Sequence, residues 1–150
     1  MRLLPKTCPS LAMVRATLRL KVSRLSTYTS ELQYPFGSPA MPVKRAPAYQ
    51  RTCVYSVNGR YTGQIVPVTI SFAAVVTRKD FASARANAGR SVKPFTVSGL
   101  GDAAWAVRPP ELDPRAGSSL FVLDGRLDIV LTAPNQASIA QLVALARRLL

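Results

Sequence analysis

The sequence contains no histidine, and only seven of its 150 residues are Asp or Glu. Histidine is the commonest general base, so its absence excludes the Ser–His and Cys–His pairings on which many hydrolases depend. The acids form no recognisable catalytic pair. Glu111 and Asp113 lie in a proline-rich stretch, Asp80 suits the start of a helix, and Asp124 and Asp128 belong to a predicted hairpin. We therefore expect no enzymatic activity.

Cysteine is also scarce, with Cys8 and Cys53 the only two. Two cysteines without histidine cannot assemble a metal site at this separation, and we expect neither a metal nor another cofactor. The cysteines are either buried thiols or the two ends of one disulfide. A disulfide would close a loop of roughly 45 residues, worth about 4 kcal/mol in the chain-entropy model. It would also place the folded domain in an oxidising compartment.

Long hydrophobic runs are missing as well. The longest run, residues 65–76, is interrupted by Pro67, Thr69 and Ser71 and is too short to span a membrane. The opening residues, Met-Arg-Leu-Leu-Pro-Lys, carry positive charge without the apolar core of a signal peptide. We therefore expect no export signal within this chain.

The residues that are present describe one basic globular domain, residues 1–150. A hydrophobic content of 48% with 18% charged residues is typical of a folded chain. Twenty Lys and Arg give a net charge of +13, which favours nucleic acid, anionic lipid or an acidic polymer as a neighbour. Most of the bases are scattered singly, with Lys44-Arg45, Arg78-Lys79 and Arg147-Arg148 as adjacent pairs, and aromatics make up 7%. This pattern indicates a solvated basic surface and no sequence-specific binding of nucleic acid.

The first half of the chain predicts one helix followed by strands. Residues 7–18 carry an apolar stripe at helical spacing, with Thr7 as the cap. Residues 20–22 alternate as an edge strand does, and four prolines exclude regular structure from residues 35–47. Strands are expected over residues 53–57 and 66–76, joined by a turn at Asn58-Gly59. The apolar face of the second strand holds Val66, Val68, Ile70, Phe72, Ala74 and Val76.

The second half predicts two further helices and a hairpin. Thr77 and Asp80 form a capping-box pattern that begins a helix ending at Gly89. A last helix is expected after a cap at Asn135, and Arg147-Arg148 near its end suit the helix dipole. Its apolar stripe consists of Ile139, Leu142, Val143, Ala146 and Leu149.

The hairpin is expected over residues 118–133. Asp124-Gly125 lies between two apolar runs, which is a strong hairpin signal, and the turn would pair Leu123 with Arg126. This pairing puts Leu120, Val122, Leu127, Ile129 and Leu131 on one face. The order of these elements predicts an α+β domain with a twisted antiparallel β-sheet flanked by helices.

Residues 99–104, Gly-Leu-Gly-Asp-Ala-Ala, match the glycine spacing of a dinucleotide-binding turn. Such a turn holds phosphate because it opens a helix whose N-terminal amides face the anion. Here the chain runs into Pro109-Pro110, so no useful helix can follow. We interpret the glycines as a tight connection into a strand over residues 103–107. Trp105 would pack against the sheet, and Asp102 would bond local amides.

Four segments together resemble a known family: KTCPSL, TCVYSV, VSGLGDAAW and LFVLDGRLDIVLTA. From about Pro5 onward the chain is similar to actinobacterial extracytoplasmic domains of unknown function, found in envelope lipoproteins and sensor-like proteins. The resemblance implies a PsbP-like α/β/α sandwich and a structural disulfide between Cys8 and Cys53. It also implies an exported protein, often lipid-anchored. The start of this chain departs from that pattern, and an upstream export segment would reconcile the two.

Two functions follow from these observations. The first is a non-catalytic, extracytoplasmic binding or interaction module of the cell envelope, stabilised by one disulfide. Its ligand or protein partner is not identified by the sequence, and anionic lipid or polymer is a candidate. The alternative is a basic protein that binds nucleic acid or an anionic polymer. No recognition-helix or RNP-like motif supports specific nucleic-acid binding.

Overall fold

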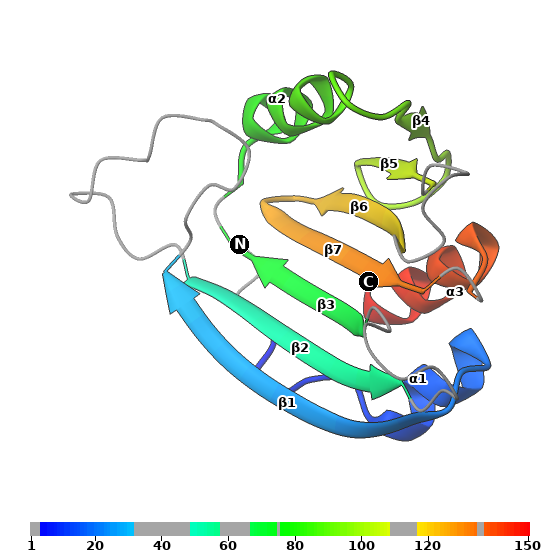
Figure 1. Cartoon of the computed structure of the whole chain (residues 1–150). Helices are drawn as coiled ribbons and strands as arrows, with labels where there is room; N and C mark the ends of the chain where they lie inside the picture. The colour runs from blue at the N-terminus through cyan, green and yellow to red at the C-terminus, as the bar shows by residue number, and fades with distance from the viewer. Residues whose placement is uncertain (1–3, 32–48, 58–66, 75, 109–116, 135–136) are drawn as a thin grey trace.

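The computed structural model describes residues 4–31, 49–57, 67–74, 76–108, 117–134 and 137–150. Within these ranges the chain forms three helices and seven strands (Figure 1). In chain order they are α1 (Leu11–Leu18), β1 (Val22–Glu31), β2 (Tyr49–Val57), β3 (Val68–Ala73), α2 (Arg78–Ala88), β4 (Phe95–Thr96), β5 (Ala103–Val107), β6 (Ser118–Asp124), β7 (Leu127–Ala133) and α3 (Ile139–Leu149). None of the described helices is long and apolar enough to cross a membrane.

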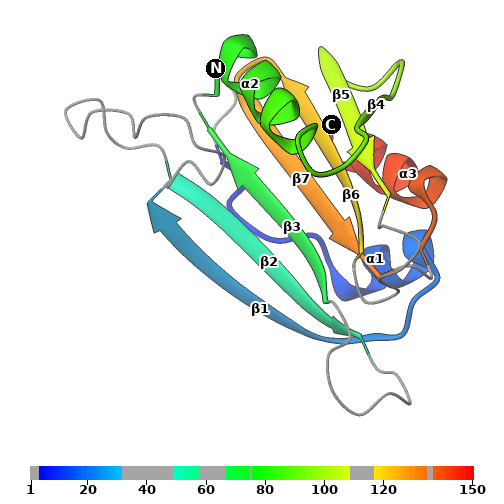
Figure 2. The same ribbon diagram turned by 45° about the horizontal axis from the view of Figure 1, so that its top comes forward.

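The strands form one antiparallel sheet in the order β1-β2-β3-β7-β6-β5-β4. Helices α1 and α3 lie against one face, whereas α2 lies against the other (Figure 2). The predicted α+β class and antiparallel sheet are therefore confirmed. The predicted edge strand near residue 22 is β1, which is longer than expected and does lie at the edge of the sheet.

The larger apolar cluster lies between the sheet and the helices α1 and α3. It holds Val14 and Leu18 from α1 and Leu142, Leu145 and Ala146 from α3, against inward-facing strand residues. The apolar face predicted for residues 66–76 is confirmed within β3, because the alternate residues of β3 belong to this cluster. These residues are Val68, Ile70 and Phe72.

A smaller apolar cluster lies under α2 on the opposite face. It consists of Ala73, Val76, Phe81, Ala84, Trp105, Phe121 and Leu123. The prediction that Val76 continues the face of Val68 is wrong. Strand β3 ends at Ala73, so the alternation stops there, and the Val76 N–H then donates to the Arg126 carbonyl oxygen at 3.0 Å.

The start of α2 is as predicted, but the caps of the other two helices are not. Helix α2 begins with the reciprocal hydrogen bonds of Thr77 and Asp80, and Gly89 is its C-cap. Helix α1 is capped by Ser10 instead of Thr7, because the Ser10 Oγ accepts from the Met13 N–H at 3.1 Å.

Helix α3 is capped by a capping box between Ser138 and Gln141, in place of the predicted Asn135, which lies outside the described residues. In both corrected helices a serine nearer the first apolar residue supplies the hydroxyl. The predicted 35–47 loop and the Asn58-Gly59 turn also lie outside the described ranges.

The β6–β7 hairpin has the predicted faces but a different register. Asp124 pairs with Leu127 and Leu123 with Asp128, so the two-residue loop is Gly125-Arg126 and the predicted Leu123–Arg126 pair is wrong. The observed partner of Leu123 is two residues beyond the predicted one. A shift of one residue would move side chains to the other face of the sheet, whereas a shift of two keeps them on the predicted face. The five predicted residues, Leu120, Val122, Leu127, Ile129 and Leu131, all lie in the larger cluster.

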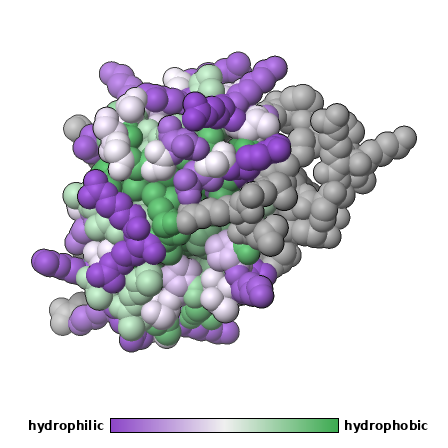
Figure 3. All heavy atoms as spheres, turned by 180° about the vertical axis from the view of Figure 1, so that it is seen from behind, coloured by the Kyte–Doolittle hydropathy of each residue, from purple (hydrophilic) through white to green (hydrophobic). Residues whose placement is uncertain are grey.

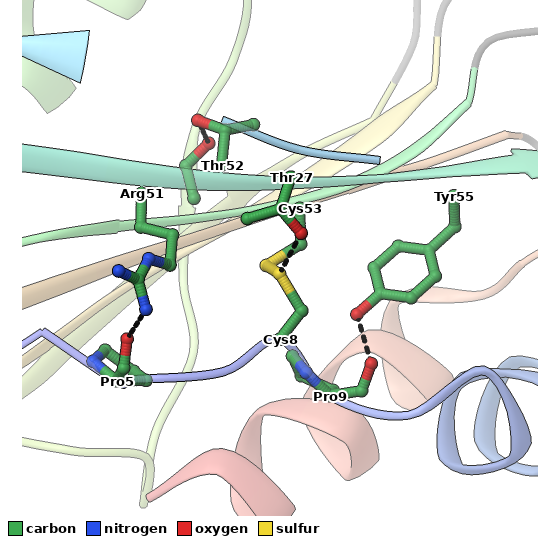
Figure 4. Close-up of a disulfide and its surroundings, with 9 residues drawn as sticks. Pro5, Cys8, Pro9, Thr27, Arg51, Thr52, Cys53 and Tyr55 are labelled. Atoms are coloured by element: carbon green, nitrogen blue, oxygen red, sulfur yellow. Dashed lines mark hydrogen bonds between the residues drawn. A yellow bond between two sulfur atoms is a disulfide. The ribbon is translucent and has the colours of Figure 1, made fainter. Parts of the chain in front are cut away.

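Three residues of β2 hold the N-terminal segment against the sheet (Figure 4). Arg51, Cys53 and Tyr55 alternate along the strand and therefore share one face. The Arg51 Nη1 donates to the Pro5 carbonyl oxygen, and the Tyr55 hydroxyl donates to the Pro9 carbonyl oxygen at 2.6 Å. Tyr55 is fully buried, and this burial raises its pKa to about 12. The hydroxyl therefore remains a donor throughout the physiological range.

The Cys8–Cys53 disulfide lies between these two hydrogen bonds, with a Cα–Cα distance of 5.9 Å. The open choice between thiols and a bridge is thus resolved in favour of the bridge. Thr27 on β1 lies 3.1 Å from the Cys8 sulfur through its Oγ1. Because a disulfide sulfur carries no hydrogen, the Thr27 hydroxyl must be the donor. The disulfide joins the segment before α1 to β2, and the Thr27 hydrogen bond joins the same segment to β1.

Asp128 is the buried carboxyl group of the hairpin. Its neighbours along β7, Leu127 and Ile129, face the larger cluster, so its side chain lies on the α2 face. Its Oδ1 is buried and has no hydrogen-bond partner among the described residues. Desolvation by burial raises the pKa of Asp128 from 3.8 to about 7. Ionisation of Asp128 therefore destabilises the folded state.

This shift predicts a pH-dependent stability. Between about pH 4 and 7 the folded state keeps a proton that the unfolded state has lost, so stability falls as the pH rises through this window. Asp128→Asn should remove that slope and stabilise the protein at pH 8 by on the order of 2–4 kcal/mol. Urea unfolding at several pH values measures this. Asp124→Asn removes a carboxylate on the other side of the same turn and should keep the slope. An unchanged slope in Asp128→Asn contradicts the assignment.

Candidate functional site

A cleft of about 510 Å³ lies between α2 and the connection from β4 to β5. We call it the α2 cleft. Cavities of this volume accommodate small organic molecules. Its lining comes from α2 (Arg78, Phe81, Ala82, Arg85), from residues 96–105 and from Leu123.

Helix α2 supplies the first wall. Residues separated by three, four and seven positions lie on one face of a helix, so Arg78, Ala82 and Arg85 follow one another along the cleft. Phe81, next to this row, is buried against the sheet and fixes the face that α2 presents. Figure 2 shows α2 lying in front of the sheet, near β4 and β5.

The glycine stretch supplies the second wall. Gly99 and Gly101 have φ values of +71° and +57°, a conformation that side chains with a Cβ rarely adopt. A Cβ at Gly101 would lie 2.5 Å from the Leu123 carbonyl oxygen, whereas a Cβ at Gly99 would meet nothing within 4 Å. Gly101 thus permits close approach to the hairpin, and Gly99 permits the turn. Strand β5 follows this stretch, so the glycines do not open a helix.

Asp102 anchors this wall to the hairpin. Its N–H donates to the Leu123 carbonyl oxygen at 2.7 Å, and its Oδ2 accepts from the Gly125 N–H at 2.8 Å. The prediction that Asp102 bonds local amides is therefore wrong, because its side-chain partner lies 23 residues away. The hydrogen bond from the Gly125 N–H to Asp102 also holds Gly125 in the loop of the hairpin. It therefore favours the pairing of Asp124 with Leu127, which the turn residues alone did not predict.

Trp105 forms the aromatic floor of the cleft and packs on the sheet as predicted. Its ring stacks on Phe121 with centroids 3.8 Å apart and meets Phe81 edge-on at 6.2 Å. The residue is only 1% exposed, and its Nε1 has no hydrogen-bond partner among the described residues. A buried indole N–H normally has a partner. The indole N–H is thus buried within a rigid apolar floor.

The charged groups of the cleft are mainly cationic. The Arg85 Nη1 donates to the Thr96 Oγ1 at 2.9 Å, which joins the two walls. Arg78 is exposed and makes no hydrogen bond or ion pair with another described residue. Asp102 is the only carboxylate among the described lining residues, and one of its oxygens already accepts from Gly125. The charged side chains of the described lining are thus two guanidinium groups and one partly satisfied carboxylate.

The predicted site residues do not belong to this cleft. Cys8 and Cys53 pack with the larger cluster, on the face of the sheet opposite α2, and both sulfurs are consumed by the disulfide. No group of three acids or cysteines within the described ranges could hold a metal ion. Sequence reasoning placed Trp105 on the sheet but missed Arg78 and Arg85. Their i, i+7 spacing beside Phe81 was the available signal.

Comparison of the chain with protein-family models, with curated proteins and with solved structures found no match. The cleft and the disulfide therefore provide the basis for a functional conclusion.

The two glycines should respond differently to substitution. Gly99→Ala should destabilise the fold by about 1–2 kcal/mol through its positive φ alone. Gly101→Ala adds a clash with the backbone of Leu123 and should cost at least about 2 kcal/mol more. Urea unfolding measures both effects. Gly125→Ala is the matched control, because it shares the positive φ (+64°) without a neighbour. Equal losses for all three variants would show that the close approach at Gly101 is unimportant.

Proposed function

We propose that the chain is a non-catalytic, extracytoplasmic binding module of the cell envelope, whose ligand site is the α2 cleft. The α2 cleft itself carries this proposal. It combines a preformed volume of about 510 Å³, an aromatic floor and the guanidinium donors of Arg78 and Arg85, as small-molecule sites generally do.

The disulfide supports the proposed compartment. Disulfides persist in oxidising compartments and are rare in the cytosol. The Cys8–Cys53 bond lies among buried side chains and holds the segment before α1. A fold that depends on this bond suits a protein of the envelope or the exterior.

The binding role is supported by the residues of the cleft. The chain has no histidine, and the single described carboxylate of the cleft is engaged by the Gly125 amide. A general acid–base pair therefore lacks members in the described lining. Binding requires only shape and donors, which the cleft supplies.

We also propose membership of the actinobacterial envelope family that the four sequence segments resemble, with its PsbP-like α/β/α sandwich. Helices on both faces of an antiparallel sheet are compatible with that arrangement (Figure 2). The family resemblance adds an exported, often lipid-anchored context to the proposed binding role.

The alternative function, binding of nucleic acid or an anionic polymer, is favoured by the net charge of +13. On the face shown in Figure 3, hydrophilic side chains are distributed among apolar ones and are not gathered into one patch. Arg147 and Arg148 are both exposed at the end of α3. This distribution suits weak, salt-sensitive attraction to anionic lipid or polymer in the envelope.

Fragment screening by two-dimensional amide NMR tests the binding site. Fragments that bind should shift amides of residues 97–102 and of α2, and Ala82→Phe should abolish these shifts by filling the cleft. Ala140→Phe is the matched control, since Ala140 is an exposed alanine of α3 on the other face. Shifts that survive Ala82→Phe would contradict the proposed site. A short DNA oligonucleotide that binds tightly at physiological salt would favour the alternative function.

A further inference from the structure

The hydrogen-bonding groups of the α2 cleft define the chemistry of its ligand. Arg78 and Arg85 offer N–H donors, and a guanidinium group accepts no hydrogen bond. The described lining contains one carboxylate, that of Asp102, already partly satisfied by Gly125. A ligand that pairs with these groups must therefore present acceptors.

The placement of charge favours an anionic acceptor. Arg78 and Arg85 are seven residues apart on one face of α2, or about 10 Å along the helix axis. Arg85 is already oriented by its bond to Thr96, so less side-chain freedom is lost when it binds a ligand. The apolar side chains beside the half-buried Arg85 lower the local dielectric there and strengthen the attraction of its guanidinium group for an anion.

The floor of the cleft adds a requirement for an apolar body. Trp105 is held between Phe121, stacked at 3.8 Å, and Phe81, edge-on at 6.2 Å. The rings of Trp105 and Phe81 are almost fully buried, so they make the floor rigid and apolar and leave no free ring face for stacking. A ligand body that covers this floor must therefore be apolar.

We propose that the α2 cleft binds a small organic anion with an apolar body. The anionic group lies at Arg78 and Arg85, and the apolar body covers the floor that Trp105 and Phe81 support. This inference rests on the proposed function and adds the chemical class of the ligand. Trp105 is the single tryptophan of the chain, so its fluorescence reports directly on this cleft.

A matched pair of fluorescent probes tests the inference on the intact, oxidised protein. Anilinonaphthalene sulfonate is an aromatic anion, and N-phenylnaphthylamine is a neutral compound of similar shape. Energy transfer from Trp105 reports binding of either probe. The anion should bind at least about tenfold more tightly than the neutral probe, because each charge-assisted hydrogen bond contributes on that scale.

Substitutions locate the effect. Arg78→Gln should weaken anion binding about tenfold and leave the neutral probe unaffected. Arg85→Gln should act in the same way, with thermal melting used to confirm that the walls stay folded. Arg90→Gln is the control, because Arg90 is exposed just beyond α2 and does not line the cleft. It removes the same charge and should leave both affinities unchanged.

The outcomes separate this inference from the proposed function. Equal affinities for the two probes, or equal losses in Arg78→Gln and Arg90→Gln, would overturn the anion inference while the cleft remains a binding site. Failure of both probes to bind, or binding that Ala82→Phe does not reduce, would overturn the proposed function as well.

Discussion

The covalent bond between Cys8 and Cys53 is the constraint on which the packing of one face of the sheet depends. The segment before α1 has no regular structure of its own, yet it must hold α1 against α3 and the sheet. Arg51, Cys53 and Tyr55 meet this requirement with two hydrogen bonds on either side of the disulfide. In the chain-entropy model such a bond, closing a loop of 45 residues, stabilises the fold by about 4 kcal/mol. That is a large share of the stability of a typical domain.

The other face depends on a second long-range contact. Asp102 joins the glycine stretch to the β6–β7 hairpin, and Gly101 allows the two backbones to approach closely. One wall of the α2 cleft is therefore fixed by the sheet. The opposite wall is fixed by Phe81, which packs edge-on against Trp105. The cleft is thus a product of the fold and requires no ligand to form it.

The features that the sequence predicted well are those set by local rules. Periodicity gave the faces of β3 and of the hairpin, and the Thr77–Asp80 pattern gave the start of α2. The failures have nonlocal or competing causes. A serine nearer the apolar run replaced the expected cap of α1. The hairpin register and the partner of Asp102 depend on each other across 23 residues, a contact that no short pattern reveals. The cleft arginines were missed because their role arises only when α2 packs beside the glycine stretch.

We propose that the protein works in its disulfide-bonded form, outside the cytoplasm. Trapping thiols in cells that naturally produce the protein tests this claim most directly. Cells are quenched with acid, and the unreduced, unfolded protein is treated with a maleimide that adds mass to each free thiol. The account predicts no labelled cysteine before reduction and two after it, because Cys8 and Cys53 are the only cysteines. Two labelled cysteines before reduction would show that the protein works in its reduced form and would contradict the account.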